Sequence, residues 1–318
     1  MTDFKLTTPV AFIIFNRPDT TERVFAEIAR AKPPKLLVVG DGPRPSRQGE
    51  AQKVEATRKI IQRVDWDCEV ITNFSAVNLG CKKRVSSGID WIFEQVEEAI
   101  ILEDDCLPDP TFFRYCQEML GRYRHDQRIG MISGDNFQFG RRYSADSYYF
   151  SKYVHIWGWA TWRDRWVECY DLTMAKWPSV RDEVAMVDMV GDMREAIYWR
   201  KIFELAYRGG IDTWDYQWVF GNWVNGRLSI APTVNLISNI GFGVNATHTT
   251  STSELENLPI IPIKFPLSHP IGVFRSLKAD RFSEKKCFRV PWWKRVRNKV
   301  AGWIHLKKIQ LNSQNRVY

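Results

Sequence analysis

The sequence lacks the features that would mark a membrane-spanning, secreted or zinc-binding protein. No stretch approaches the roughly 20 consecutive apolar residues that a transmembrane helix needs. Residues 1–8 contain no basic segment followed by a long apolar one, as a secretory signal would. The six cysteines are scattered without a CxxC pair, which argues against a zinc site and a disulfide framework. We therefore expect a cytoplasmic protein with reduced thiols.

Net positive charge is also absent from most of the chain. The net charge is +8, but the segment from Arg281 to Lys308 contains ten Lys or Arg and one acid, Glu284. That segment carries +9, which leaves −1 for the rest of the chain. A body close to neutral lacks the basic surface that nucleic-acid binding requires, so we expect no nucleic-acid partner.

Strand and helix patterns alternate in the first 128 residues. Apolar runs predict strands, and amphipathic or polar stretches between them predict helices. Such alternation favours a mostly parallel α/β sheet, in which ligands bind outside the carboxyl ends of the strands. The alternation weakens from residue 129, and a proline-rich connector begins near residue 254. The predicted strands are 10–15, 35–39, 68–71 and 99–102, and the predicted helices are 19–31, 48–63 and 82–96.

Three acids, Glu103, Asp104 and Asp105, directly follow the fourth predicted strand. Adjacent carboxylates are unfavourable unless a cation or several hydrogen-bond donors relieve the repulsion. Mg²⁺-type ions take oxygen ligands and often bind one or two carboxylates together with substrate phosphates. The triplet therefore favours a metal that bridges Asp105 to a diphosphate. The alternatives are a solvated acidic loop and the acids that commonly begin a helix, here near Asp109.

Polar residues also follow the first two strands. Asn16 and Arg17 end the first, and Asp41 ends the second, so all three belong to one edge of a parallel sheet. An Asp accepts a hydrogen bond from a ring N–H of a base, and an Arg offers a planar fork for stacking or carbonyl contact. The alternative is ordinary turn chemistry, because Asp-Gly-Pro and Arg-Pro are common at turns and helix starts.

Two further candidates lie in the second half. Asp215 is flanked by Trp214, Tyr216 and Trp218, and partial burial among rings would raise the pKa of its carboxyl towards that of a general base. Alternatively, Asp215 is a surface acid on a helix whose rings enter the core. His248 lies in a polar loop, where it could bind a metal or a phosphate. A single loop histidine is more often incidental.

In this order, the residues resemble nucleotide-sugar glycosyltransferases of the GT-A fold. The similarity is closest to the N-acetylglucosaminyltransferase I type and its bacterial family 2-like relatives, and it covers about residues 8–250. The most specific block runs from Gly80 through the acidic triplet to the Phe112-Phe113 pair. The resemblance implies a Rossmann-like GT-A domain over residues 1–253, with a nucleotide-binding half at 1–128 and an acceptor half at 129–253.

The resemblance also implies residue roles. Arg17 and Asp41 would hold the uracil of a UDP-sugar, Asp104 the ribose side, and Asp105 the Mn²⁺ or Mg²⁺ on the diphosphate. Asp215 would be the base of an inverting transfer to a hydroxyl of a glycan or lipid-linked acceptor. The remaining expected contacts are Asn16 and Arg84 at the nucleotide, His248 at the metal, and Glu103, Asp135, Gly158, Trp159 and Trp214 at the donor sugar or acceptor.

Two alternative functions stay open from the sequence. A sugar nucleotidyltransferase would carry a glycine-rich signature with a lysine after the first strand, which residues 15–18 lack. A non-catalytic nucleotide- or glycan-binding protein would not require Asp215 or a metal. The family's second acid, directly after the base, is replaced by Tyr216, and the acceptor contacts show no match.

Residues 254–318 form the connector and a basic, amphipathic tail. Trp293, Val296, Val300 and Trp303 recur at helical spacing with Lys and Arg between them. An aromatic and apolar stripe in a basic helix is typical of an interfacial membrane anchor. This pattern predicts peripheral association with the anionic inner membrane. The alternative is a C-terminal helix docked on the body or on a partner subunit.

Overall fold

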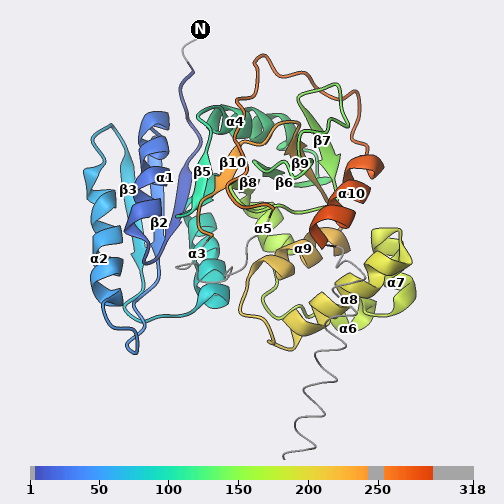
Figure 1. Ribbon diagram of the computed structural model, residues 1–318, viewed down its shortest axis with the longest axis horizontal. Coiled ribbons are helices and arrows are strands. Elements are labelled where there is room, and N and C mark those ends of the chain that lie inside the picture. The colour runs from blue at the N-terminus through green and yellow to red at the C-terminus, as the bar shows by residue number, and fades with distance from the viewer. Residues whose placement is uncertain (1–3, 243–253, 289–318) are drawn as a thin grey trace, which may run out of the picture.

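The computed structural model describes residues 4–242 and 254–288. An eight-stranded sheet with the order β3-β2-β1-β4-β8-β6-β9-β7 forms its centre, and helices flank it (Figure 1). This confirms the predicted α/β fold. The predicted basic helical tail, from residue 289 on, and His248 lie outside the described residues. Within the described ranges, no helix is both long enough and apolar enough to cross a bilayer.

The first half contains the parallel part of the sheet. Three of its strands, β1, β2 and β4, are nearly continuous apolar runs because both faces of the sheet are covered there, as the sequence predicted, whereas β3 at the end of the sheet is polar and partly exposed. The strands are β1 (Val10–Ile14), β2 (Lys35–Gly40), β3 (Glu69–Phe74) and β4 (Glu98–Glu103), all parallel to their neighbours within this set. The helices are α1 (Pro18–Ala31), α2 (Glu50–Ile60) with the 3₁₀ turn η1 (Ile61–Arg63), and α3 (Cys81–Gln95).

Antiparallel pairing enters the sheet in the second half. β8 (Trp159–Trp162) lies antiparallel between β4 and β6 (Ile129–Ser133), so β4 and β6 run in the same direction. The other strands are β7 (Tyr148–Ser151), β9 (Leu228–Pro232) and the small pair β5 (Cys106–Pro108) and β10 (Ile237–Asn239). The helices are α4 (Thr111–Tyr123), α5 (Arg163–Cys169), α6 (Trp177–Val180), α7 (Glu183–Val190), α8 (Met193–Tyr207) and α9 (Asp215–Val224).

Each face of the sheet has its own hydrophobic core. Strand residues alternate between the faces, so Phe12 packs on the side of α1 and α4, whereas Ile13 packs on the side of α3 and α9. Both side chains are buried, as are their neighbours along β1. Tight packing on both sides fixes where the strands end, and therefore where the residues after them lie.

The proline-rich segment after residue 253 packs on this body. Ile263 and Leu267 belong to the core on the α1 and α4 side. Asp280, in α10 (Leu277–Ser283), is buried, accepts a hydrogen bond of 2.6 Å from Ser151 Oγ and pairs with Arg275. The chain then continues as a short π-helical turn, η2 (Glu284–Phe288). Residues 254–288 are therefore part of the folded body.

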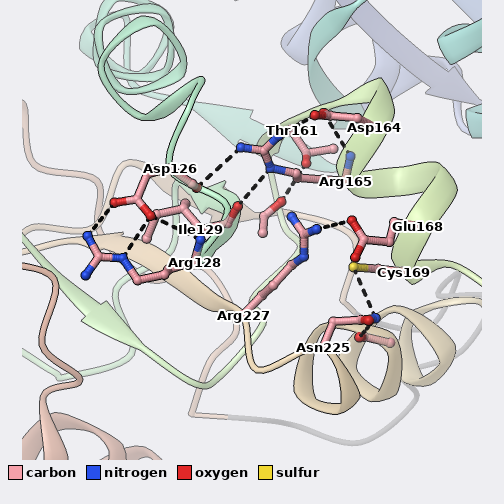
Figure 2. A network of polar contacts seen from close by, with 12 residues as sticks. Asp126, Arg128, Ile129, Thr161, Asp164, Arg165, Glu168, Cys169, Asn225 and Arg227 are labelled. Carbon is pink, nitrogen blue, oxygen red and sulfur yellow. Dashed lines mark hydrogen bonds and ion pairs between the residues drawn. The ribbon is translucent and has the colours of Figure 1, made fainter.

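Two buried arginines fix the edge of the sheet where β6 and β9 begin. Figure 2 shows Arg165, whose guanidinium donates to the carbonyl oxygens of Ile129 and Asp126, both at 3.3 Å. It also donates to the carbonyl oxygen of Arg124 at 2.8 Å. Arg165 pairs with Asp164, and Arg227 pairs with Glu168 (Figure 2). These contacts tie α5 to the starts of the strands. The opposite edge, where β1, β2, β4 and β6 end, is left for the candidate site.

Candidate functional site

A cavity of about 320 Å³ lies where β1, β2 and β4 end. This is the edge at which ligands bind in open α/β sheets. Its volume falls within the range of small-molecule sites. Acidic and basic side chains from both halves of the chain line it: Asp41, Glu103, Asp104 and Asp212 with Arg17, Arg44 and Arg84. The structure thus brings together five of the residues that the sequence singled out.

Arg17 connects the first strand end to the acidic triplet. It follows β1 and immediately precedes α1. Its Nη1 donates to Asp105 Oδ2 at 2.8 Å, and its Nη2 pairs with Asp104 Oδ1. Asp104 is almost fully buried and also accepts a hydrogen bond of 3.1 Å from the Phe15 backbone N–H. One guanidinium therefore forms ion pairs with two neighbouring carboxylates.

The negative charge of the triplet exceeds what Arg17 neutralises. Burial raises the pKa of Glu103, and the charges of Asp105 and Asp104 raise it further. Burial also raises the pKa of Asp104, because desolvation outweighs the opposing effect of Arg17. Each of these carboxyls is harder to ionise than an ordinary one. An additional cation at this edge would favour the ionised forms of Glu103 and Asp104.

Asp105 offers oxygen ligands of the kind that a hard divalent cation takes, although one of its oxygens pairs with Arg17. Its carboxylate oxygens are the donor type that Mg²⁺ and Mn²⁺ take. The loop after β10 packs against Asp105. Ile240 N–H donates to the backbone carbonyl oxygen of Asp105 at 2.8 Å, and a Cβ on Gly241 would lie 2.0 Å from the carboxylate oxygen Oδ2. Among residues 4–242 and 254–288, however, no cluster of three His, Cys, Asp or Glu forms a complete metal site.

Asp41 and Arg84 shape the wall of the cavity. The Asp41 carboxylate accepts hydrogen bonds from the backbone N–H groups of Leu79 (2.9 Å) and Gly80 (3.1 Å) and from Asn78 Nδ2 (2.9 Å). Arg84 Nε donates to the Gly40 carbonyl at 3.2 Å. These bonds tie the turn before α3 to the end of β2. Both residues therefore hold the wall in place as well as line it.

Asn16 lies on the other side of Arg17, beside a second cavity of about 650 Å³. Its Nδ2 donates to Glu50 Oε1 at 2.9 Å, and Glu50 also pairs with Arg44. The Arg44 guanidinium lies over the Phe15 ring at 5.5 Å from the ring centre. Arg17 and Arg44 line both cavities, so they separate the two.

Asp215 approaches the same edge from the second half. It is the first residue of α9, where a negative charge is favoured by the helix dipole, and it accepts a hydrogen bond from the Thr213 hydroxyl. Its charge contributes to the raised pKa of Glu103 and of Cys81. Asp212 lies closer to the wall and accepts from the Lys82 backbone N–H at 3.1 Å. The loop 209–214 therefore brings one acid, Asp212, to the cavity, and Asp215 directly follows this loop.

The predicted contacts of the donor sugar lie deeper. Trp159 and Trp214 are buried and stack at 5.7 Å, so they belong to the core below the site. Gly158 has a φ of +86° and packs against Ile237, leaving no room for a side chain. Asp135 is fully buried, which raises the pKa of its carboxyl, and it accepts from the Trp157 N–H at 3.0 Å. The cavity lining described above includes none of these four.

The sequence reasoning missed Arg44, Asn78 and Asp212. Arg44 and Asn78 stand in the turns after β2 and before α3, so their position beside strand ends was the available signal. Asp212 gave no local signal, because only the packing of the second half against α3 brings it to the cavity.

Comparison with known proteins does not assign a family. No family model and no curated protein matches the chain. The solved structure of mouse xyloside xylosyltransferase 1, apo form, aligns over 68% of this chain and 81% of that chain, with 10% identity and a TM-score of 0.34. UDP-glucose pyrophosphorylase complexed with UDP-glucose aligns over 45% and 62%, with 10% identity and a TM-score of 0.23. TM-scores this low do not place the chain in either group.

Proposed function

We propose that this chain is an inverting glycosyltransferase that uses a UDP-sugar donor. The observation that carries the proposal is the cavity at the ends of β1, β2 and β4, in which Arg17 faces the acidic triplet. Polar strand ends that supply both acids and a guanidinium suit a ligand with a base, a ribose and a diphosphate. A metal-assisted, nucleotide-dependent reaction uses all of these groups.

The donor nucleotide would occupy the cavity. Asp41 and Asn78 present oxygen and amide groups for the uracil edge, and Arg17 and Arg44 supply positive charge for the phosphates. The Asp104 carboxylate would accept hydrogen bonds from the ribose hydroxyls. The backbone at Gly241, which touches the Arg17 and Asp105 pair, would border the diphosphate. In this arrangement Arg84 supports the base-binding wall through its bond to the Gly40 carbonyl.

A divalent cation, Mn²⁺ or Mg²⁺, would be held by Asp105. When bound, it would neutralise the charge that develops on the leaving diphosphate. The raised pKa of Glu103 is caused mainly by burial, and the charges of Asp105 and Asp104 add to it; this negative charge beside the buried carboxyl supports a cation at the site. Glu103 would remain beside the cation rather than contact the nucleotide. His248 stays a proposed second ligand.

Asp215 would act on the acceptor. A glycan or lipid-linked hydroxyl attacks the anomeric carbon from the face opposite the diphosphate, and Asp215 accepts its proton. The new carbon–oxygen bond forms as the bond to the phosphate oxygen breaks, and that electron pair leaves with UDP. A single displacement inverts the anomeric configuration. Asp215 directly follows the loop that lines the cavity through Asp212, which supports this assignment.

The test is UDP release from a panel of UDP-sugars with Mn²⁺ and candidate acceptors. The wild type should release UDP and form product, and Asp215→Asn should reduce turnover by a factor of roughly a hundred or more while it still binds UDP. Asp188→Asn, an exposed acid on α7, is the matched control and should be fully active. UDP binding without turnover would favour a binding protein. Synthesis of a UDP-sugar from UTP and a sugar phosphate would favour a nucleotidyltransferase. Either result contradicts the proposal.

A further inference from the structure

Helix α8 presents a mixed apolar and basic face to solvent. Met193, Ile197 and Leu205 are 46%, 40% and 46% exposed and recur at intervals of four and eight residues. The opposite face of the helix enters the core through Trp199 and Phe203. Four exposed basic residues lie among the apolar ones: Arg194, Arg200, Lys201 and Arg208. Apolar side chains within a basic helix face are typical of helices that lie at a membrane surface.

A groove beside α8 concentrates this positive charge. It has a volume of about 760 Å³, and Arg181, Arg200, Lys201 and Arg208 line it. Its two acids already have partners. Asp182 caps α7 by accepting from the Ala185 N–H at 2.9 Å, and Glu204 accepts from Trp177 Nε1 at 2.8 Å and pairs with Arg208. Within the described ranges, Arg200 and Lys201 form no ion pair, so the groove is complementary to an anion.

The described part of the chain ends beside α8, on the side of the helix that faces the core. Phe288, the last described residue, packs its ring against Trp199 at 5.1 Å and Tyr198 at 6.4 Å, both in α8. The sequence after Phe288 contains eight Lys or Arg and no acid. Charge of the same sign argues against this tail as the partner of the α8 face. A negatively charged external surface would attract both.

We propose that the exposed face of α8 and its groove bind an anionic lipid surface. Arg200, Lys201 and Arg181 would contact headgroup phosphates, while Ile197 and Leu205 would enter the interface between headgroups and acyl chains. The apolar residues favour a bilayer over a soluble polyanion, because a soluble polyanion gains nothing from them. The inference does not depend on the proposed function. It would nevertheless place the loop 209–214, which follows α8 and lines the cavity through Asp212, close to the membrane.

The test is flotation of the full chain with vesicles of phosphatidylcholine alone and with vesicles that also contain phosphatidylglycerol. The wild type should float only with the anionic vesicles. Arg200→Glu with Lys201→Glu should weaken this binding roughly tenfold or more, because each basic residue near an anionic leaflet adds measurably to the affinity. Arg23→Glu with Arg30→Glu, on exposed positions of α1, changes the net charge equally and should float as the wild type does.

A second variant separates the bilayer from soluble polyanions. Ile197→Ser with Leu205→Ser should lose flotation but keep its affinity for heparin. The proposal is overturned if the wild type does not float with anionic vesicles, or if either α8 variant floats as well as the wild type. It is also overturned if the α1 control loses as much flotation as the α8 charge variant. UDP binding, measured on the same variants, should not change. The flotation result therefore tests membrane binding independently of the proposed function.

Discussion

Arg17 and Asp105 form an ion pair of 2.8 Å at the edge of the sheet where β1 and β4 end. The same guanidinium pairs with Asp104, so it bridges two neighbouring carboxylates. This is the charge arrangement that a divalent cation would also satisfy. Arg17 and the metal proposed at Asp105 would therefore compete for the same oxygen atoms, unless a bound diphosphate drew the guanidinium towards its own charge.

Arg17→Ala should destabilise the protein and strengthen its binding of Mn²⁺ in the absence of nucleotide. Removing one partner of a buried pair leaves carboxylates without a counter-charge and costs about 3–5 kcal/mol of unfolding free energy. The freed Asp105 oxygens should then bind Mn²⁺ more tightly, as calorimetry would measure. Arg17→Lys keeps the charge and is the matched control. Equal Mn²⁺ affinity in the wild type and in Arg17→Ala would contradict the competition.

Gly241→Ala should disturb the Arg17–Asp105 ion pair from the side of the loop after β10. A Cβ at this position would lie 2.0 Å from Asp105 Oδ2 and 2.6 Å from Arg17 Nη1, so one of the groups must move. We expect a loss of about 1–3 kcal/mol in the free energy of unfolding, measured by urea denaturation. Gly121→Ala in α4 is the control, since a Cβ there meets nothing within 4 Å and should be neutral or slightly stabilising. Equal stability of the two variants would show that the loop after β10 does not press on Asp105.

Asp41→Asn should weaken the hydrogen bonds that hold the turn before α3 to the end of β2, and should therefore lower the stability of the protein. The variant replaces a carboxylate that accepts from Leu79, Gly80 and Asn78 with an amide that accepts through only one atom. Each buried donor left without a partner costs about 1–3 kcal/mol. Thermal unfolding should show the loss, and UDP affinity should fall with it. Asp65→Asn, an exposed acid, should leave both unchanged. If UDP affinity persists in Asp41→Asn, this wall is not the base site.

His155 should make the stability depend on pH. Burial among aromatic rings, with Phe137 at 4.5 Å, lowers the pKa of its imidazole to about 4. The unfolded chain takes up this proton near pH 6.5, so the unfolded state binds more protons between these values. Neutral His155 therefore contributes about 3 kcal/mol to the free energy of unfolding above about pH 6.5, and this contribution is lost as the pH falls towards 4.

His155→Phe should remove that part of the slope, as urea denaturation at a series of pH values would measure. His125→Gln, at an exposed position, is the matched control and should keep the slope of the wild type. A slope that survives in His155→Phe would mean that another group titrates in this range.

Most of the parallel half of the fold was predictable because β1, β2 and β4 are buried on both faces and their sequences are nearly continuous apolar runs. Since parallel strands end at one edge, the meeting of Arg17, Asp41 and Asp104 was predictable as well. The second half was not, because β8 enters antiparallel and the chain order no longer gives the spatial order. Trp159 and Trp214 were expected at the donor sugar, but an aromatic core and an aromatic sugar wall have the same sequence pattern.

Binding of UDP with and without Mn²⁺ tests the central claim most directly. With Mn²⁺, UDP at a hundred times its dissociation constant should stabilise the wild type by about 2.7 kcal/mol in thermal unfolding, and UMP, which lacks the second phosphate, should stabilise it less. EDTA or Asp105→Ala should remove most of the UDP effect. A UDP response of equal size in Mn²⁺ and in EDTA, or no response in either, would contradict a metal-assisted nucleotide-sugar site at Arg17 and Asp105.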